Sequence, residues 1–446
     1  MFGIFHGNPI VKDAKIYMGS KEEIREEMME CKNAYMNAVV TRVPLCSVED
    51  TKCALKIAKS AVKETKSSSL EQRISWLEDV ANVLEVYRED MAQTLVDEVS
   101  KPITFARIEV DKCVETIRLI AQELLLLDTK NMLTSLRENS KTNIGYFTTV
   151  PLGVVVCITP YTFPLNLVAH QIAPALAVGN AVVLKPTSEA GLTAYKLAKI
   201  FNKSKFAIKD ALSVVYGDFE VSNTLIKSSI PTIISFMGSV SMENIIKQQA
   251  GIKKVKLELR GNTAIFIDDS ADIKYAASRC VVGAFVNSGQ VSIPLQHIYV
   301  HAFMYEEFAK AMVRETKKIN IGSPYEEDTF MGSLINQESM RRAISWVESA
   351  QNEGAKLLIG AVVLDDIFHP TVLSEVRDDM KVLGEEVFAP IVSLIKVKSD
   401  EEVISKMNDN PDILQCSIFT NNLNRIQKFI DDVVCEELRV NDVFDV

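Results

Sequence analysis

Long apolar runs alternate with amphipathic stretches between residues 145 and 300. The runs VVVCIT (154–159) and AVVLKP (181–186) are rich in β-branched residues, which is typical of strands buried on both faces. The stretches FPLNLVAHQIAPALAVGN (163–180) and KLAKIFN (196–202) repeat their apolar positions at helical spacing. Strands that alternate with helices of this length indicate βαβ units, so the chain is predicted to be an α/β protein with parallel sheets.

Residues 47–126 are predicted to be mainly helical. Ser47 lies three residues before Asp50, which resembles a capping box at a helix start, and apolar residues then recur at helical spacing over 47–65. A second helical pattern covers 69–126 and is interrupted at Pro102.

The second half repeats the α/β texture. KVKLELRG (254–261), TAIFID (263–268) and HIYVH (297–301) are predicted strands, and further strands are expected in VVLDD (362–366), APIVSLIKV (389–397) and SIFT (417–420). ADIKYAASRCVVGAFVNSGQ (271–290) is predicted to be one long helix, and YEEFAKAMVRETKKI (305–319) another. No repeat or low-complexity linker marks a domain boundary.

Composition narrows the function classes. The formal net charge of −10 argues against nucleic acid as the main partner, because phosphate binding requires clustered Lys and Arg. No apolar run reaches the roughly 18 residues of a membrane span, and the first residues lack the pattern of a signal peptide. The eight Cys form no C-x-x-C pair, so no metal site is predicted and free core thiols in the cytoplasm are expected.

Eight segments, in this order and spacing, resemble the aldehyde dehydrogenase superfamily. They are TVPLGVVVCITPYTFPLN (149–166), GNAVVLKPTSEAGLTA (179–194), ISFMGS (234–239), KLELRGN (256–262), FVNSGQVSI (285–293), EEVFAPIV (385–392), the strand around 415–420 and VND (440–442). Within that family, the residues of these segments are similar to those of the branch that acts on lactaldehyde, glyceraldehyde and succinate semialdehyde.

The resemblance implies a fold of two parallel-sheet α/β domains and a small β-arm for oligomerisation. Residues 1–130 and 151–257 would form the NAD(P)-binding domain, 131–150 part of the arm, and 258–446 the catalytic domain. Family members normally continue well past the VND segment, so the C-terminal part of the arm is expected to be missing. A homo-oligomer is expected all the same.

The resemblance also implies which residues bind the cofactor. They are Thr159, Pro160, Lys185, Ser188, Gly238, Ser239, Glu386 and Phe388. Lys185 would reach the adenosine ribose from the carboxyl end of a buried strand, where ligands of open α/β sheets bind. The family often has Glu where this chain has Ser188, and a neutral hydroxyl would tolerate a 2′-phosphate. NADP is therefore slightly favoured over NAD, although the neighbouring Glu189 weakens this inference.

Two departures concern the phosphate and ribose contacts. Gly238 and Ser239 would begin a helix whose N–H groups bind pyrophosphate. The family usually has a second Gly five residues after the first, where this chain has Glu243, an acid that would repel phosphate unless it points away. Glu386 and Phe388, by contrast, match the family pattern that holds the nicotinamide ribose and packs against its ring.

The catalytic positions depart further from the family. The family's nucleophilic Cys corresponds to Ser292, and a hydroxyl needs an adjacent base that no His supplies before His297. The Asn of the oxyanion hole corresponds to Thr162, and losing one such donor costs about 10²–10³ in rate. Glu258 is retained as the general base, but Arg260 stands where the family has Gly and would fill the pocket or bind an anion. Cys280 is expected to be a core residue rather than a substitute nucleophile.

Three readings follow from these residues. The first is a diverged family member that binds NAD or NADP but is impaired in, or incapable of, aldehyde oxidation. The second is an active enzyme that oxidises a small aldehyde, or hydrolyses esters through Ser292 and Glu258. The third is a structural or regulatory subunit without cofactor.

Overall fold

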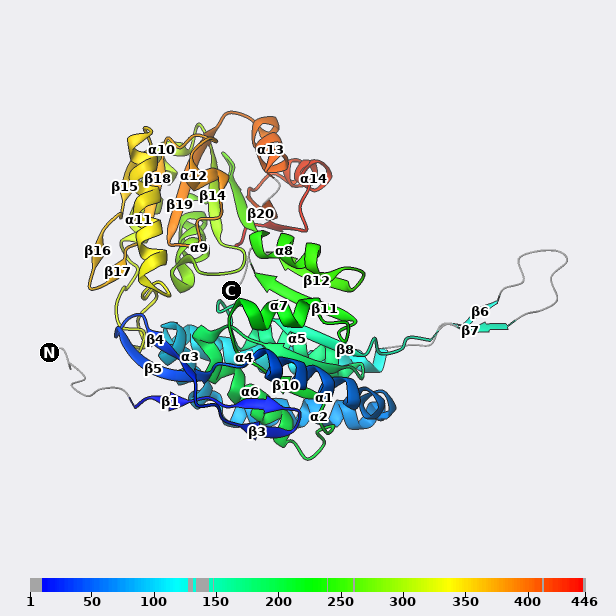
Figure 1. Cartoon of the computed structure of the whole chain (residues 1–446). Coiled ribbons are helices and arrows are strands. Elements are labelled where there is room, and N and C mark those ends of the chain that lie inside the picture. Colours follow the sequence, from blue (N-terminus) through cyan, green and yellow to red (C-terminus); the bar gives the residue numbers. More distant parts are fainter. Residues whose placement is uncertain are drawn as a thin grey trace. The chain divides into compact units, whose positions relative to one another are not determined.

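The computed structural model describes residues 10–443 except 127–130, 134–143, 147, 239, 260, 411 and 412. By its internal contacts the chain divides into two compact units. The first contains residues 1–32, 39–98 and 107–258, and the second contains residues 33–38, 99–106 and 259–446. Each unit has its own seven-stranded sheet. Labelled strands of both sheets can be followed in Figure 1.

The sheet of the first unit has the strand order β12-β11-β8-β9-β10-β2-β3. Strands β11, β8, β9 and β10 run parallel, and β2 and β3 continue the sheet in antiparallel fashion. The bounds are β2 (Ile16–Met18), β3 (Lys21–Glu23), β8 (Val154–Ile158), β9 (Ala181–Lys185), β10 (Leu212–Val214), β11 (Ile233–Gly238) and β12 (Lys254–Leu259). Every residue of β8 is buried, as the uninterrupted apolar run predicts.

Helices of the first unit follow the sequence pattern closely. They are α1 (Val48–Ser67), α2 (Leu70–Val86), α3 (Arg88–Val99), α4 (Ile103–Glu123), α5 (Asn166–Ala177), α6 (Gly191–Lys203), α7 (Phe219–Lys227) and α8 (Val240–Ala250). Ser47 caps α1 in a full capping box with Asp50, as predicted. The break near Pro102 is also confirmed, because α3 ends at Val99 and α4 begins at Ile103.

The amino-terminal strands were not predicted from the sequence. Besides β2 and β3, a three-stranded sheet in the order β1-β5-β4 comprises β1 (Lys12–Asp13), β4 (Met28–Asn33) and β5 (Ala38–Pro44). Most of these strands are short and carry charged residues, so they lack the apolar run that marks the buried strands. Two further short strands, β6 (Asn131–Leu133) and β7 (Ile144–Tyr146), pair in antiparallel fashion within the predicted arm. The remaining arm residues up to 147 lie outside the described residues.

The sheet of the second unit has the order β15-β18-β19-β14-β13-β20-β21, in which β15 alone among these strands is antiparallel to its neighbour. Its strands are β13 (Asn262–Ile267), β14 (Leu295–His301), β15 (Lys356–Ile359), β18 (Thr371–Ser374), β19 (Ile391–Val397), β20 (Ile413–Phe419) and β21 (Glu437–Val440). A separate pair joins β16 (Val363–Leu364) to β17 (Ile367–Phe368). The strand predictions for this half are therefore confirmed, although β16 is only two residues long.

The helices of the second unit are α9 (Ile273–Phe285), α10 (Tyr305–Thr316), α11 (Gln337–Asn352), α12 (Lys381–Gly384), α13 (Asp400–Asp409) and α14 (Leu423–Asp432). The prediction of one helix over 271–290 is wrong at its end, because α9 stops at Phe285. Asn287, Ser288 and Gly289 have φ values of 49°, 58° and 68°, and a right-handed helix cannot continue through positive φ.

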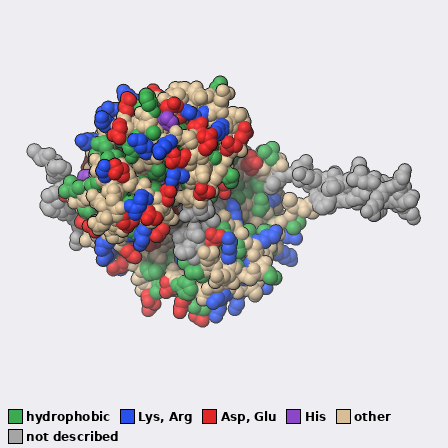
Figure 2. Space-filling model, turned by 90° about the horizontal axis from the view of Figure 1, so that it is seen from above, with side chains coloured by type: hydrophobic (Ala, Val, Ile, Leu, Met, Phe, Trp, Pro, Cys, Tyr) green, Lys and Arg blue, Asp and Glu red, His purple; other side chains and the backbone are tan. Residues whose placement is uncertain are grey.

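Surface charge is mixed. On the face that Figure 2 shows, the described Lys and Arg side chains are interspersed with Asp and Glu and do not gather in one basic patch.

Within the described part of the chain, no helix is both long and apolar enough to cross a membrane. The same residues contain no group of three or more His, Cys, Asp and Glu that could hold a metal ion.

Candidate functional site

The first sheet has a topological switch point at β8. From β8 the chain moves outward through β9 and β10, and then returns to the other side of β8 to form β11. Ligands of open α/β sheets bind at the carboxyl ends of the strands at such a point. Thr159 and Pro160 follow β8 directly, and Gly238 ends β11, so three of the predicted cofactor residues lie at this edge.

Polar groups at the switch point fit a bound dinucleotide. The Thr159 amide donates to the Lys185 carbonyl at 3.3 Å, which links the ends of β8 and β9. The buried Thr159 hydroxyl has no hydrogen-bond partner among the described residues, so it is free to bond a ligand. Helix α8 begins directly after Gly238 and Ser239, and its first N–H groups could hold a pyrophosphate.

The structure answers the predictions for Glu243 and Thr162 at this edge only in part. Glu243 is 4% exposed and forms an ion pair with Lys247 one turn later on α8. That pairing offsets the repulsion which an acid near a phosphate would otherwise cause. Ser239 lies outside the described residues. Thr162 is 1% exposed in the loop between β8 and α5, and its predicted oxyanion role stays a prediction.

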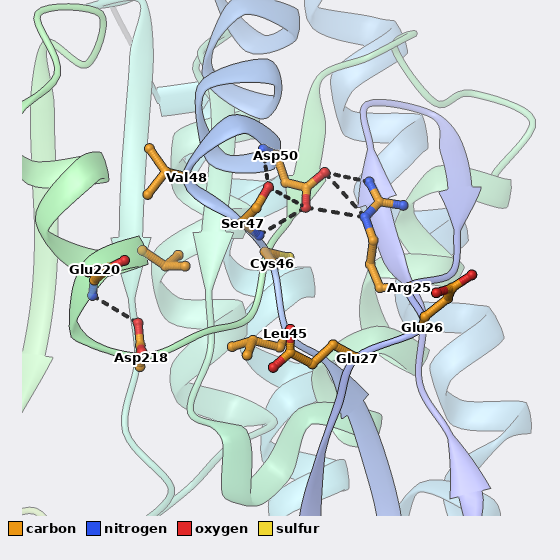
Figure 3. A pocket seen from close by; sticks show the side chains of 11 residues that line it. Arg25, Glu26, Glu27, Leu45, Cys46, Ser47, Val48, Asp50, Asp218 and Glu220 are labelled. Atoms are coloured by element: carbon orange, nitrogen blue, oxygen red, sulfur yellow. Dashed lines mark hydrogen bonds and ion pairs between the residues drawn. The ribbon is translucent and has the colours of Figure 1, made fainter.

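Lys185 ends β9 and is partly buried. Burial lowers the pKa of its ammonium group, and the nearby carboxylates of Glu189 and Asp218 oppose that shift. Ser188 is half-buried, and its hydroxyl lies 3.9 Å from the Met29 sulfur. Asp218 also lines a pocket of the first unit, together with residues from 25–27, from 45–50 and from the start of α7 (Figure 3).

Two buried carboxylates hold the helices that follow β8 and β9. Glu109 accepts from the first amides of α5, from Leu165 at 2.8 Å and Asn166 at 3.2 Å. Glu98 accepts from the Leu192 and Thr193 amides at 2.8 Å near the start of α6. A carboxylate at a helix N-terminus satisfies free N–H groups and complements the helix dipole. The sequence did not single out either acid, because an isolated Glu on a helix is usually a surface residue.

In the second unit, the loop between α9 and β14 carries Ser292. Its backbone passes through three consecutive left-handed residues, Asn287, Ser288 and Gly289. A Cβ atom on Gly289 would lie 2.4 Å from the Ala389 carbonyl oxygen, so only glycine fits against that neighbouring segment. The structure thus brings the Ser292 loop together with the loop that contains Glu386 and Phe388.

Buried amide side chains fix both loops. The Gln296 side chain donates to the Glu385 carbonyl at 2.7 Å and accepts from the Val387 amide at 3.2 Å. The Gln290 side chain accepts from the Ile335 amide at 2.8 Å, and Ser288 donates to the Gly332 carbonyl at 2.8 Å. Sequence reasoning missed these glutamines, although a Gln inside an apolar strand such as PLQHIYVH is a usable signal of a buried, satisfied amide.

Ser292 lies at the amino-terminal edge of the second sheet. Its carbonyl accepts from the Gly261 amide at 3.3 Å, just before β13 begins. Its hydroxyl is buried and has no hydrogen-bond partner among the described residues. Within the described part of the chain, therefore, no side chain is placed to take a proton from this oxygen. The side chain of Glu258, the predicted base on β12, is not described, and Arg260 lies outside the described residues.

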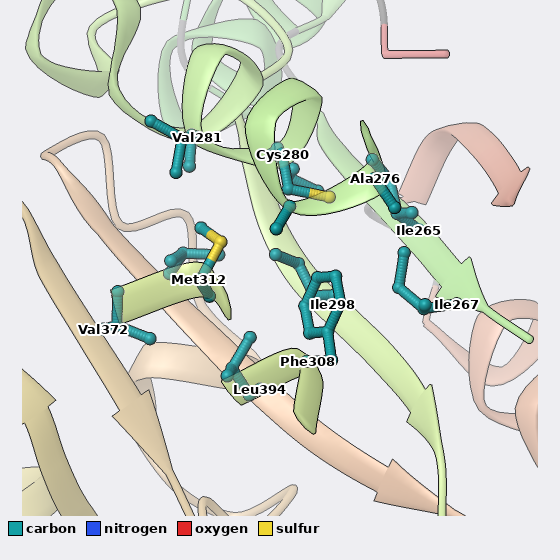
Figure 4. Close-up of a cluster of buried hydrophobic side chains, with 14 of the residues drawn as sticks. Ile265, Ile267, Ala276, Cys280, Val281, Ile298, Phe308, Met312, Val372 and Leu394 are labelled. Carbon is teal, nitrogen blue, oxygen red and sulfur yellow. The ribbon is translucent and has the colours of Figure 1, made fainter. Parts of the chain in front are cut away.

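Neither of the other side chains considered as reactive groups is suited to replace the base or the nucleophile. His297 lies on β14, as predicted, and burial lowers the pKa of its imidazole to about 4 although a backbone group of Leu383 opposes the shift. Cys280 is fully buried in the core cluster drawn in Figure 4, between residues such as Val281 and Ile298. Burial raises the pKa of this thiol far above its ordinary value, which confirms it as a packing residue.

Glu386 and Phe388 lie just before β19. Phe388 is buried with a φ of 49°, and Arg342 donates to the carbonyls of Glu386 at 3.5 Å and Phe388 at 3.4 Å. A bulky residue with positive φ is uncommon and indicates a backbone that its surroundings hold in place. These predicted cofactor residues belong to the second unit, whereas Thr159, Pro160, Lys185, Ser188 and Gly238 belong to the first.

Comparison with known proteins agrees with this architecture. The family model described as "Aldehyde dehydrogenase family" matches residues 20–446, which is nearly the whole chain. The chain belongs to the aldehyde dehydrogenase family. Among curated relatives, the 3-sulfolactaldehyde dehydrogenase of Priestia aryabhattai is 35% identical over 433 residues, covering 97% of this chain and 90% of that protein. The lactaldehyde dehydrogenase of Methanococcus vannielii is 34% identical over 418 residues, covering 93% and 88%.

Solved structures of family members share the fold. Aldehyde dehydrogenase 21 from Physcomitrella patens, in complex with the reaction product succinate, superposes with a TM-score of 0.94 at 32% identity and covers 97% of this chain and 90% of that chain. NADP-dependent glyceraldehyde-3-phosphate dehydrogenase from Bacillus halodurans, complexed with NADP, has a TM-score of 0.94 at 28% identity, covering 97% and 91%. The predicted fold of two parallel-sheet α/β regions is therefore confirmed, and aldehyde dehydrogenase family members bind NAD or NADP.

Proposed function

We propose that this chain is a dinucleotide-binding aldehyde dehydrogenase family protein in which oxidation of a small aldehyde is strongly impaired. The observation that carries the proposal is the Ser292 hydroxyl, which is buried and has no hydrogen-bonded base among the described residues. A serine hydroxyl is a weak nucleophile without such a base, whereas a cysteine thiol is partly ionised near neutral pH.

The proposed roles follow the order of the reaction. Ser292 would attack the aldehyde carbon, and the Thr162 hydroxyl and a backbone N–H would take up the charge on its oxygen. When bound, NAD or NADP would accept the hydride. Glu258 would then activate water to release the acid. With oxygen as the attacking atom the intermediate is an ester instead of a thioester, and we expect a rate loss of several orders of magnitude.

The relatives suggest the size of the substrate. Those in the comparison are named lactaldehyde and 3-sulfolactaldehyde dehydrogenases, so we propose a three-carbon hydroxyaldehyde, or an analogue of one, as the ligand. The same names favour the alternative of a working dehydrogenase that uses the Ser292 oxygen. Assembly as a homo-oligomer and residence in the cytoplasm also belong to this proposal.

Binding and chemistry can be tested separately. Titration of the purified chain with NADH and NADPH, followed by nicotinamide fluorescence, should show binding of at least one. If neither binds at millimolar concentration, the dinucleotide-binding function is wrong. Ser292→Cys should then raise lactaldehyde oxidation by orders of magnitude if the remaining site is intact. If it restores nothing, Ser292→Cys combined with Thr162→Asn tests whether the second replacement also blocks the reaction.

The alternative of an active enzyme predicts that activity depends on Ser292. If Ser292 is the working nucleophile, Ser292→Ala should abolish aldehyde oxidation or ester hydrolysis, while cofactor binding remains. If the unmodified chain has only a trace of either activity and Ser292→Ala leaves that trace unchanged, the active-enzyme alternative is wrong. The two variants therefore separate an impaired site from a serine-dependent one.

A further inference from the structure

Helix α1 carries a row of lysines along its exposed side. Its buried residues include Ala54, Ala58 and Ala61, and the helix packs against β8, β9, β10 and α7 of the first unit. The exposed row, here called the lysine stripe, consists of Lys52, Lys56, Lys59, Lys63 and Lys66. At about 100° per residue, these positions share a sector of the helix about 80° wide, and no other residue from 52 to 67 falls within it. The five side chains therefore form one straight row about 21 Å long.

No acid neutralises the lysine stripe. None of its ammonium groups forms an ion pair among the described residues, whereas Lys196, Lys247 and Lys428 on other helices each pair with a carboxylate. Glu64 is the one acid that follows Lys52 on α1, and it lies about 120° around the helix from the centre of the stripe.

The spacing of the stripe works against the stability of the helix. Successive lysines are three or four residues apart, so like charges lie side by side along α1 and repel one another. A helix that needed only a soluble outer face would gain stability from acids interleaved at these positions. The unbroken row therefore points to a use for concentrated positive charge at this place.

The charge of the whole chain has the opposite sign, with a formal net charge of −10. At physiological ionic strength, however, exposed charges more than about 8 Å apart are largely screened from one another. An anionic surface that lies along α1 therefore meets the lysine stripe, while acids on distant parts of the chain have little effect on it.

We propose that the lysine stripe is a docking surface for the anionic headgroups of a membrane, so that the protein binds reversibly at the surface of a bilayer. Clusters of four or more basic residues on an amphipathic helix are typical of surfaces that bind anionic lipid. The apolar side of α1 is already buried within the first unit, so the helix binds through its charge and does not insert. This surface is separate from the proposed cofactor and aldehyde chemistry.

The composition of the stripe favours a bilayer over other polyanions. Surfaces that recognise nucleic acid rely on Arg, whose planar group binds phosphate through two bonds, and on aromatic residues that stack on bases; the stripe contains neither. A stable interface with an acidic protein has an apolar core, and the sector of the stripe holds no apolar side chain. A flat anionic surface requires only that all five hydrated charges face it together.

Co-sedimentation of the full chain with vesicles tests the proposal. The chain should bind phosphatidylcholine vesicles that contain phosphatidylserine but not vesicles of phosphatidylcholine alone, and added salt should release it. Combined Lys56→Gln, Lys59→Gln and Lys63→Gln should lower partitioning about 100-fold, since each lysine near the surface contributes about 5-fold. Arg at the same three positions should preserve binding. The Gln variant should remain folded in urea unfolding, because it removes repulsion within α1.

A matched control removes three exposed lysines elsewhere, by combining Lys274→Gln on α9, Lys310→Gln on α10 and Lys317→Gln just after α10. This variant has the same net charge as the Gln variant of the stripe and should partition like the unmodified chain. An equal loss in both variants would show that total charge and not the stripe governs binding, which would overturn the proposal.

Two further results would overturn it. One is the absence of binding to phosphatidylserine vesicles at low salt. The other is tighter binding to duplex DNA than to these vesicles at equal phosphate concentration, which would assign the stripe to nucleic acid. Titration with NADH should give the same result for the unmodified chain and for the Gln variant of the stripe. Failure of the proposed cofactor binding would therefore leave the vesicle test intact.

Discussion

The two units place their predicted functional residues at opposite ends of their strands. In the first unit Thr159, Lys185 and Gly238 lie at the carboxyl ends of β8, β9 and β11. In the second unit Ser292 and Phe388 precede β14 and β19, at the amino-terminal edge of the sheet. The first arrangement follows from strand order alone, because a topological switch point creates a ligand site. The position of Ser292 and Phe388 in the second unit does not follow from strand order.

Local backbone structure positions Ser292 and Phe388 in the second unit. Three left-handed residues turn the chain after α9, and Gly289 packs directly on the Ala389 backbone. The Gln296 side chain at the start of β14 then bonds the loop that contains Glu386, and the Gln290 side chain bonds Ile335. A site built in this way is held by strain and by satisfied amides rather than by a general property of the sheet. Substitutions should therefore disturb the second unit's loops more than the turns of the first.

The largest expected effect is that of Gly289→Ala. Its Cβ would meet backbone atoms of Ala389 at 2.4 and 2.6 Å, in a residue with φ of 68°. We expect a loss of about 4 kcal/mol in the free energy of unfolding, since neither backbone can yield cheaply. Urea unfolding measures it.

Gly251→Ala in the first unit is the matched control. Gly251 has a φ of 63°, but nothing lies within 4 Å of the added Cβ. The cost should be only the left-handed strain, about 1 kcal/mol. Equal costs at the two glycines would show that the loop of the second unit is not packed more tightly than an open turn.

A smaller effect is the pH dependence that His297 contributes. Burial lowers its pKa from 6.5 to about 4, so between these values the unfolded chain binds more protons than the folded one. Stability from this group is present above pH 6.5 and is lost as the pH falls through about 4, by up to about 3 kcal/mol. Urea unfolding over that range, compared with His297→Gln, isolates the contribution.

In His297→Gln the slope of stability against pH should be shallower than in the unmodified chain. His301→Gln, at the half-exposed end of the same strand, should retain the original slope. An unchanged slope in His297→Gln would mean that the imidazole is not kept neutral by burial.

The smallest of the three effects concerns Glu98 in the first unit. Its carboxylate accepts four hydrogen bonds, from the Leu192 and Thr193 amides and from the Thr193 and Thr41 hydroxyls at 2.7–2.9 Å. Glu98→Gln places an NH₂ group against these donors and should cost about 2 kcal/mol. Burial raises the pKa of the Glu98 carboxyl to about 7, so thermal unfolding at about pH 9, where the group is ionised, measures the cost.

Thr41→Val removes one of the four donors to Glu98 and should cost about 1 kcal/mol. If Glu98→Gln lowers the free energy of unfolding no more than Thr41→Val does, the charge of Glu98 contributes nothing to holding α6. Strand order alone would then explain how the first unit positions its residues at the carboxyl ends of the strands.

Much of the fold was predictable from the sequence, for identifiable reasons. The strands β8, β9 and β13 are continuous apolar runs, and α1 carries its capping box in Ser47 and Asp50. Both signals are local in the sequence and can be recognised without knowing the tertiary structure. The amino-terminal strands β1 and β3 gave no such signal, because they are short edge strands with exposed charges. The buried strand β2 is only three residues long, and the apolar run of β5 was missed.

The site was predictable only in part. Family resemblance located Ser292 and Phe388, but the helical pattern of 271–290 concealed the left-handed turn at Asn287. In this turn Asn287 donates to the Gln290 carbonyl and Ser288 to the Gly332 carbonyl, and apolar periodicity does not register such contacts. The pocket that Asp218 lines was equally hidden, because its walls come from three separate parts of the chain.

The most direct test of the account is the rate at which the purified, unmodified chain forms NADH from NAD and lactaldehyde, measured beside Ser292→Cys. We expect a rate orders of magnitude below that of the cysteine variant, because no base among the described residues is bonded to the buried Ser292 hydroxyl. Turnover by the unmodified chain at about 10 per second, typical of working enzymes, would contradict it.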